Sequence, residues 1–107
     1  MTSLRILFAH GPDDEAIWRA GFDLVQAAAA LDLPLELGFA GDGLRLVTLG
    51  ADGSRPPSHA RFASLGLLDV AAARVPAAVC GPAALPLEPL DDQAWRDWLR
   101  RAPLQVW

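Results

Sequence analysis

The sequence has a single cysteine, Cys80, and no lysine, since all nine of its basic residues are arginines. One cysteine cannot form a disulfide within the chain, which fits a reducing compartment. Cysteine and histidine do not occur together at the spacing of a zinc site, so neither a structural metal nor another cofactor is expected. Without lysine the chain also lacks the phosphate-binding residue of a P-loop, and Gly41-Asp42-Gly43 does not continue with that motif.

Long apolar runs are also missing. Arg5 and His10 interrupt the first hydrophobic stretch, and no segment approaches the roughly 18 consecutive apolar residues of a membrane-spanning helix. The N-terminus has no basic region followed by a small-residue cleavage site, so a signal peptide is not expected. We therefore expect a soluble, cytoplasmic protein without membrane contact.

An excess of positive charge is absent as well, because the formal net charge is −4. Direct binding to nucleic acid needs basic residues concentrated on one face, where they neutralise phosphates. The nearest approach to such a cluster, Arg96, Arg100 and Arg101, shares a predicted helix with several aspartates. A solvated helix face of mixed charge explains this pattern, and direct binding to DNA or RNA is not expected.

What is present is enough apolar material for one core. The 107 residues suffice for a single domain and are too few for two. Hydrophobic residues make up 52% of the chain against 21% charged, which is rich for a soluble domain. Part of the apolar surface is therefore expected to be covered by neighbouring subunits. The sequence predicts one domain over residues 1–107 that assembles into oligomers.

The first part of the chain has the pattern of a strand, a helix and a second strand. Residues 4–9 are nearly all apolar, as in a strand buried on both faces of a parallel sheet. Asp13 or Asp14 can cap the following helix, expected over 14–31, whose two apolar stripes would face the sheet and another helix or subunit. Alternating apolar residues predict a strand over 35–39. A unit this short favours a parallel crossover connection.

The middle of the chain is less clear. Residues 44–49 fit either a returning hairpin strand or a short helical turn, and the Gly/Pro-rich residues 50–57 predict a loop. Ser58 is expected to cap a short helix that ends near Gly66.

A third strand is predicted over residues 75–80, and the prolines that follow permit only a short helical turn before a loop. The last helix is expected over 92–101, and 104–107 fit a terminal strand. The four tryptophans are interpreted as core or interface residues. Together these elements predict an α/β fold with a mostly parallel sheet flanked by helices.

Cys80 is the most informative residue. It stands where the predicted third strand gives way to the turn Gly81-Pro82. At the C-terminal edge of a strand and just before a helix start, backbone N–H groups could stabilise a thiolate. Free cysteines more often behave as small buried hydrophobic residues, so a reactive thiol and a packing residue both remain open.

Other ionisable residues have weaker claims. His10 follows the first strand, where parallel α/β sheets usually place functional groups, and as an imidazolium near Cys80 it could favour the thiolate. A loop histidine that caps local backbone is the simpler interpretation. His59 is expected at the surface. The acidic run 13–15 is interpreted as capping and dipole groups without a catalytic role.

Several segments together resemble a known family. They are residues 4–9 leading into Gly11-Pro12, Phe39-Ala40-Gly41-Asp42-Gly43 followed by Leu44 to Gly50, Leu65-Gly66-Leu67-Leu68-Asp69-Val70, Val79-Cys80 before small residues, and Pro103 to Trp107. In this order and spacing they resemble the DsrE/DsrF-like sulfur-relay family, closest to its TusC/DsrF-type subunit, over nearly the whole chain.

The resemblance implies a single DsrE/DsrF-like domain over 1–107, with a small α/β fold of the DsrE/YchN-like kind that assembles as trimers or hexamers. It also implies a short helix rather than a strand after the Asp-Gly pair. The implied function is persulfide transfer, as in the synthesis of 2-thiouridine in tRNA or in sulfur oxidation. The implied partners are TusB/TusD-like or DsrE/DsrH-like chains.

In those complexes the sulfur-carrying cysteine belongs to the DsrE/TusD-type chain, and Cys80 falls at the matching position. The resemblance therefore makes Cys80 the candidate persulfide acceptor of a sulfurtransferase. His10 is the candidate assisting residue because of its position after the first strand. The carrier motif continues as an alanine-rich helix with basic residues, whereas residues 81–86 have no basic residue and an early proline. The chain is also somewhat short for the family, mainly in the region after Cys80. The alternative is a non-catalytic structural or regulatory subunit with the same fold.

Overall fold

The computed structural model describes residues 4–68, 70, 72–79, 81–101 and 103–107. The strands within these residues are β1 (Leu4–Phe8), β2 (Leu35–Phe39), β3 (Ala73–Val75), β4 (Leu87–Pro89) and β5 (Gln105–Val106). They form one sheet in the order β4-β3-β2-β1-β5, and every neighbouring pair is parallel. The predicted α/β fold with a mostly parallel sheet is therefore confirmed.

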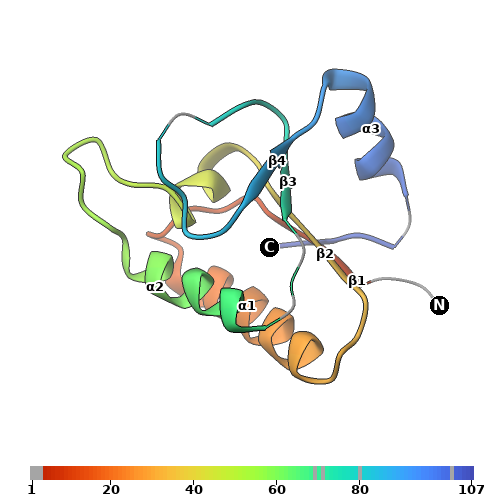
Figure 1. Cartoon of the computed structure of the whole chain (residues 1–107), viewed down its shortest axis with the longest axis horizontal. Coiled ribbons are helices and arrows are strands. Elements are labelled where there is room, and N and C mark those ends of the chain that lie inside the picture. Colours follow the sequence, from red (N-terminus) through yellow and green to blue (C-terminus); the bar gives the residue numbers. More distant parts are fainter. Residues whose placement is uncertain (1–3, 69, 71, 80, 102) are drawn as a thin grey trace.

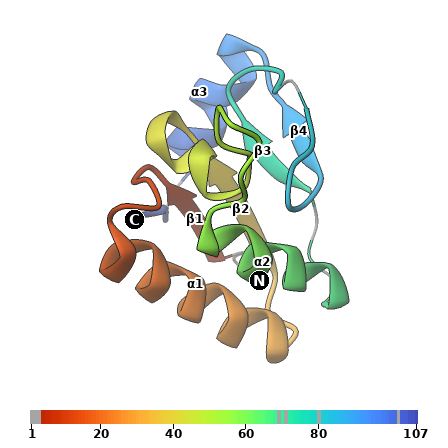
Figure 2. The same ribbon diagram turned by 90° about the vertical axis from the view of Figure 1, so that its left-hand side faces the viewer.

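Helices cover both faces of the sheet. They are α1 (Glu15–Ala30), the 3-10 helix η1 (Gly41–Leu46), α2 (Pro57–Ala63), the 3-10 helix η2 (Ser64–Leu67) and α3 (Asp92–Arg100). Figures 1 and 2 show α1 and α2 side by side on one face, with α3 on the opposite face. The two faces therefore have different environments.

The main core lies between the sheet and the helices α1 and α2. Its centre is the ring of Phe62 on α2, whose centroid lies 5.1 Å from that of Phe8, 5.1 Å from that of Phe22 and 5.3 Å from that of Phe39. All four rings are almost completely buried. Edge-to-face contacts of this kind stabilise aromatic pairs beyond the area they bury. The core thus joins β1 and β2 to both helices.

Helix α1 begins one residue later than expected, and its capping differs in detail. Asp14 occupies the N-cap position, but its side chain makes no capping hydrogen bond within the described residues. The main-chain oxygen of Asp14 instead accepts from the amides of Ile17 and Trp18, at 3.0 and 3.2 Å. Of the two apolar stripes, one is buried against the sheet, whereas Ile17 and Leu31 are 36% and 71% exposed. The stripe that contains Ile17 and Leu31 is therefore only partly covered in the single chain.

The ambiguous segment 44–49 begins in a helix. Residues 41–46 form η1, so a short helix is present as the resemblance implied, although it starts at Gly41 and already includes the Asp-Gly pair. Thr48 then forms an isolated antiparallel bridge with Ala83, and no hairpin strand is found among the described residues that follow β2. Gly43 explains the tight path, because a Cβ atom there would lie 1.8 Å from the carbonyl oxygen of Phe8. Only glycine allows η1 to approach the end of β1 this closely.

The predictions for α2 need two corrections. The helix begins at Pro57, and proline is well suited to a first helical turn because its missing N–H would have no partner there. Ser58 therefore does not cap the helix: its hydroxyl is buried and donates to the carbonyl oxygen of Leu46 at 2.7 Å. Gly66 does not end the helical region either, since it lies within η2.

The third strand lies closer to the N-terminus than the predicted residues 75–80. The strand is β3, at Ala73–Val75, and it ends before Pro76, which has no N–H to donate to a ladder. The described residues between Val75 and Leu87 contain no helical turn; they form bends and one isolated bridge, then β4. Strand β4 was missed. It accommodates Pro89 because it lies at the edge of the sheet.

The C-terminal elements follow the prediction closely. The carboxylate of Asp91 caps α3 by accepting from the amide of Ala94 at 2.7 Å. Strand β5 then pairs in parallel with β1, so that Ile6 lies opposite Gln105 and Leu7 lies opposite Val106. This pairing makes β1 an interior strand, as its apolar sequence predicted.

Candidate functional site

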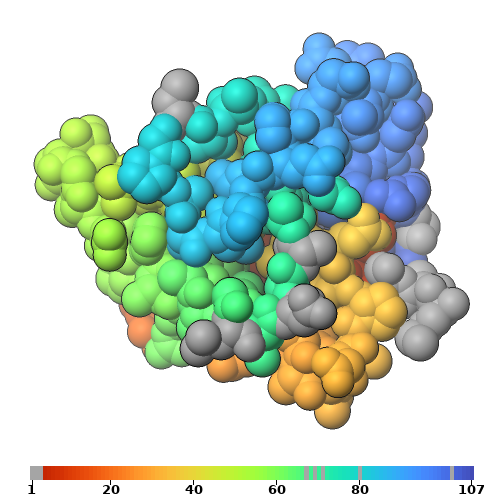
Figure 3. All heavy atoms as spheres, in the orientation of Figure 1, coloured from red at the N-terminus to blue at the C-terminus, as the bar shows by residue number. Residues whose placement is uncertain are grey.

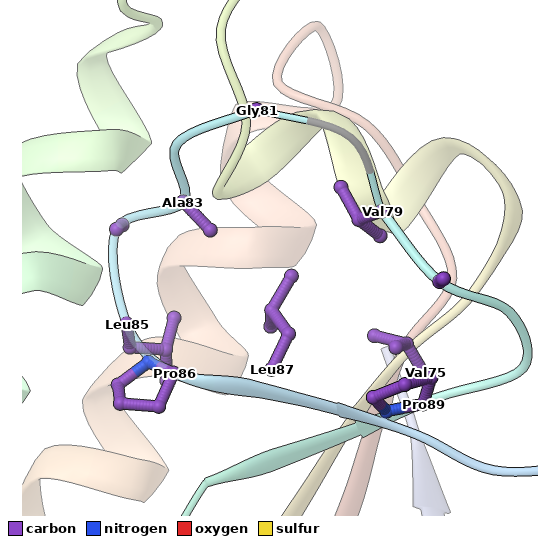
Figure 4. Close-up of a pocket in the computed structure, with 10 residues that line it drawn as sticks. Val75, Val79, Gly81, Ala83, Leu85, Pro86, Leu87 and Pro89 are labelled. Atoms are coloured by element: carbon purple, nitrogen blue, oxygen red, sulfur yellow. The ribbon is translucent and has the colours of Figure 1, made fainter.

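A cavity of about 530 Å³ lies beside β3 and β4. Its wall is formed by the ends of these strands and by the chain that connects them. In Figure 4 the side chains of Val79, Ala83 and Leu87 point into the same space, which the connecting chain encircles. Figure 3 shows the light-blue residues of this region on the outside of the molecule. The cavity is therefore open to a partner or ligand.

The connecting chain, residues 76–86, is called the Cys80 loop here because it contains the single thiol. Cys80 itself lies outside the described residues, so its role stays a prediction. The residues bonded to it in the chain, Val79 and Gly81, both line the cavity. Gly81 has a φ of +89°, a left-handed conformation that favours glycine. The turn seen in the sequence after Cys80 is thus a specific backbone requirement.

The described cavity wall is apolar. Its residues are valine, alanine, leucine, proline and glycine, so polar contacts there come from backbone groups. No helix follows in the described residues 81–86, so the predicted helix N-terminus that would stabilise a thiolate is not formed. Apolar surroundings raise the pKa of a thiol. The wall therefore offers apolar contact surface and no cationic side chain.

His10 is not among the described residues that line the cavity beside β3 and β4. It is exposed just after β1, and its amide donates to the carbonyl oxygen of Trp107 at 3.3 Å. Its assistance to Cys80 remains a prediction.

The acidic run 13–15 makes ion pairs. Asp13 lies 3.7 Å from Arg45, and Glu15 lies 2.7 Å from Arg19, one helical turn away. Glu15 lies in the first turn of α1, as the interpretation of the run as dipole groups predicted, whereas the side chain of Asp14 makes no capping hydrogen bond among the described residues. Asp13 and Arg45 also line a smaller cavity of about 260 Å³, next to the loop that precedes α2.

The prediction that His59 lies at the surface was wrong. His59 is buried near the start of α2, and its Nε2 atom has no hydrogen-bond partner among the residues that the structure describes. The neighbouring prolines suggested an exposed loop, but they begin a helix that packs on η1 through Ser58. Burial of His59 follows from that packing, which local sequence does not reveal.

Sequence reasoning also missed an ionic cluster beneath α3. Glu36 accepts from Arg101 at 3.1 Å and from the indole N–H of Trp98 at 3.3 Å, and it lies 3.9 Å from Nε of Arg5. Burial, followed by the positive charge of Arg101, lowers the pKa of Arg5, while Glu36 opposes this shift. The available signal was the occurrence of Arg5 and Glu36 within two otherwise apolar strands.

Two kinds of site can be assessed over the described residues. They contain no group of three or more histidine, cysteine, aspartate or glutamate side chains placed to hold a metal ion. No described helix is both long enough and apolar enough to span a membrane. The cavity beside β3 and β4 is the main candidate site because its wall includes Val79 and Gly81, the chain neighbours of Cys80.

The fold and site define a small parallel α/β protein with an apolar cavity that is lined by a loop whose sequence contains one thiol. The chain belongs to the DsrE/DsrF-like family, whose model matches residues 3–93. Comparisons with curated proteins and with solved structures gave no match.

Proposed function

We propose that the chain is a TusC/DsrF-type subunit of a sulfur-relay complex, in which persulfide sulfur is received at Cys80. The family is generally linked to sulfur relay, which supports this assignment. The observation that carries it is the cavity whose wall includes Val79 and Gly81, the two chain neighbours of Cys80. A relay of this kind could serve 2-thiouridine synthesis in tRNA or sulfur oxidation.

The proposed chemistry is a thiol exchange without net oxidation. The thiolate of Cys80 attacks the outer sulfur of a donor persulfide, R–S–SH. A new S–S bond forms on Cys80, the S–S bond of the donor breaks, and the donor leaves as the thiolate R–S⁻ with the electron pair. In the next step a thiolate of the acceptor attacks the outer sulfur of the Cys80 persulfide. The S–S bond on Cys80 breaks, the outer sulfur stays on the acceptor, and the Cys80 sulfur is released as a thiolate. Neither a metal nor a cofactor takes part.

The exchange requires ionisation of the thiol, whose ordinary pKa is about 8.5. The apolar lining provides no cation that would lower this value. We assign the assisting role to His10, with a basic group of a partner chain as the other source of positive charge.

The proposed assembly is a cytoplasmic trimer or hexamer, with TusB/TusD-like or DsrE/DsrH-like chains as partners and no direct contact with nucleic acid. The exposed Ile17 on α1 and Leu31 just after it support an assembly, since they leave one apolar stripe partly uncovered. Native mass spectrometry, alone and after mixing with such chains, measures the number and kind of subunits.

A second function has its own support. In a non-catalytic subunit, Cys80 would be a packing residue beside the active cysteine of a partner chain. The segment 81–86 favours this alternative, because it has no basic residue and forms no helix like that of the carrier motif.

The two functions differ in sulfur labelling. The protein and its Cys80→Ser variant are incubated with a cysteine desulfurase and radiolabelled cysteine, then separated without reductant. A sulfur carrier retains label that a thiol reagent releases as sulfide, and the serine variant does not. Equal labelling of both proteins, or none, would support the non-catalytic subunit.

A further inference from the structure

The second half of the Cys80 loop is attached to the core at two points. At the last residue of the loop, the carbonyl oxygen of Pro86 accepts from the amide of Ala73 at 3.0 Å. The amide of Ala84 donates to the carbonyl oxygen of Val47 at 2.8 Å, and Ala83 forms an isolated antiparallel bridge with Thr48. The next residue, Leu85, is buried. The residues that follow η1 therefore fix the end of the loop that leads into β4.

Val47, the attachment point for Ala84, lies in a segment that is itself firmly held. Leu46 and Val47 are completely buried, and the carbonyl oxygen of Leu46 accepts from the hydroxyl of Ser58. The hydroxyl of Thr48 donates to the carbonyl oxygen of Leu44 at 2.8 Å. At its other end η1 is pressed against β1, because Gly43 packs against the carbonyl of Phe8. The segment 44–48 is thus a rigid support.

The first half of the Cys80 loop has no comparable support. In residues 76–79 the structure gives no backbone hydrogen bond to another part of the described chain. Loops with few such bonds open more readily than the elements that flank them. Within residues 76–86, backbone hydrogen bonds to the rest of the described chain are therefore confined to the second half, at Ala84 with Val47 and at Pro86 with Ala73. The bond between Ala84 and Val47 is the one nearer to Cys80 in the sequence.

We infer that the segment 44–48 positions the Cys80 loop for sulfur transfer, through the hydrogen bond from Ala84 to Val47. The inference rests on the proposed function of Cys80. A fixed second half restricts the directions in which the loop can present its thiol, and exchange between sulfur atoms depends strongly on access and direction of attack. Val47 and Thr48 are positioning residues, since they act through the loop.

The test uses Ala84→Pro, which removes the amide donor, with Ala84→Ser as the matched control that keeps it. Two rates are measured on Cys80: alkylation by iodoacetamide, and sulfur acceptance at saturating desulfurase and cysteine. Loss of one hydrogen bond changes the equilibrium between the anchored and the detached loop by about two- to tenfold. We expect alkylation of the proline variant to be faster by about that factor, sulfur acceptance to be slower, and the serine variant to match the wild type.

Thr48→Val provides a second variant in case Ala84→Pro does not fold. It keeps the shape of the side chain and removes its bond to Leu44, so it should change both rates in the same directions. In the wild type, the amide of Ala84 should exchange with solvent about tenfold more slowly than that of Ala78. Folded variants with unchanged rates, or equal exchange at the two amides, would overturn the inference.

The experiment also separates the two levels of the proposal. Failure of the wild type to take up sulfur contradicts the proposed function, while alkylation and amide exchange still decide whether the loop is anchored. Normal sulfur uptake by Ala84→Pro supports the proposed function and contradicts the positioning role. Alkylation that becomes faster only in proportion to the fall in thermal midpoint would reflect a general loss of stability and would contradict the positioning role.

Discussion

The guanidinium of Arg5 lies against the indole of Trp98, with its central carbon 4.6 Å from the ring centroid. The side chain of Arg5 is only 4% exposed, and its nitrogens have no hydrogen-bond partner among the described residues. Glu36, the carboxylate paired with it, is 3.9 Å away and accepts hydrogen bonds from Trp98 and Arg101 instead. The aromatic contact therefore dominates the surroundings of this buried charge.

Replacement of Arg5 by methionine should change stability little. Removing one member of a buried ion pair is costly when it leaves the other unpaired, but Glu36 keeps Arg101 and Trp98 as partners. We expect the free energy of unfolding of Arg5→Met to stay within about 1 kcal/mol of the wild type or to rise, whereas Trp98→Ala should lower it by about 3–5 kcal/mol. Urea denaturation measures both. A loss above about 2 kcal/mol in Arg5→Met would show that the charge itself is stabilising.

Gly38 provides the space in which Trp98 lies on β2. A Cβ atom at this position would approach the Trp98 ring to 2.6 Å, so Gly38→Ala forces the ring to move. Overpacking of this kind should lower the free energy of unfolding by about 1–3 kcal/mol. Combining it with Trp98→Leu should give a smaller loss than the sum of the two single variants, because the smaller side chain relieves the clash. Additive losses would contradict the contact.

Gly81 should be required for its backbone conformation alone. Its φ is +89° and nothing lies within 4 Å of a Cβ atom built there, so Gly81→Ala meets strain without a clash. The expected loss is about 1–3 kcal/mol. Gly66→Ala is the control, since that site is equally open but does not have a positive φ, and it should be neutral or slightly stabilising. Similar effects of both changes would show that the left-handed turn after Cys80 is not a constraint.

Asp52 should titrate below its ordinary range. Hydrogen bonds from the side chain and backbone of Ser54 lower the pKa of this exposed carboxylate from 3.8. A lowered folded-state pKa means that the associated stabilisation is present above the unfolded value and is lost as the pH falls through the folded one. An NMR titration should give a midpoint below 3.8 for Asp52 and a higher one in Ser54→Ala. An identical midpoint in both proteins would contradict this contact.

The first half of the fold could be predicted because its signals are local. The apolar run of β1, the helical stripes of α1 and the alternation in β2 depend on residues close in sequence, and all three elements lie where they were expected. Strands β3 and β4 have three residues each. Their register comes from pairing with strands distant in sequence, so the apolar residues 75–79 were mistaken for the strand itself.

The candidate site was only partly visible in the sequence. The sequence identified Cys80 and the turn at Gly81, but the cavity requires β4, which was missed. The buried position of His59 and the cluster around Glu36 depend on how helices pack on the sheet. Such contacts between distant segments leave no local periodicity, which explains why they were not predicted.

A role for Cys80 in sulfur relay can be tested by the intact mass of the protein, measured without reductant after incubation with a cysteine desulfurase and free cysteine. Wild type and Cys80→Ser are compared after circular dichroism has shown that both are folded. We expect the addition of one sulfur atom to the wild type and none to the variant. No addition to the wild type, or the same addition to both, would contradict a role for Cys80 in sulfur relay.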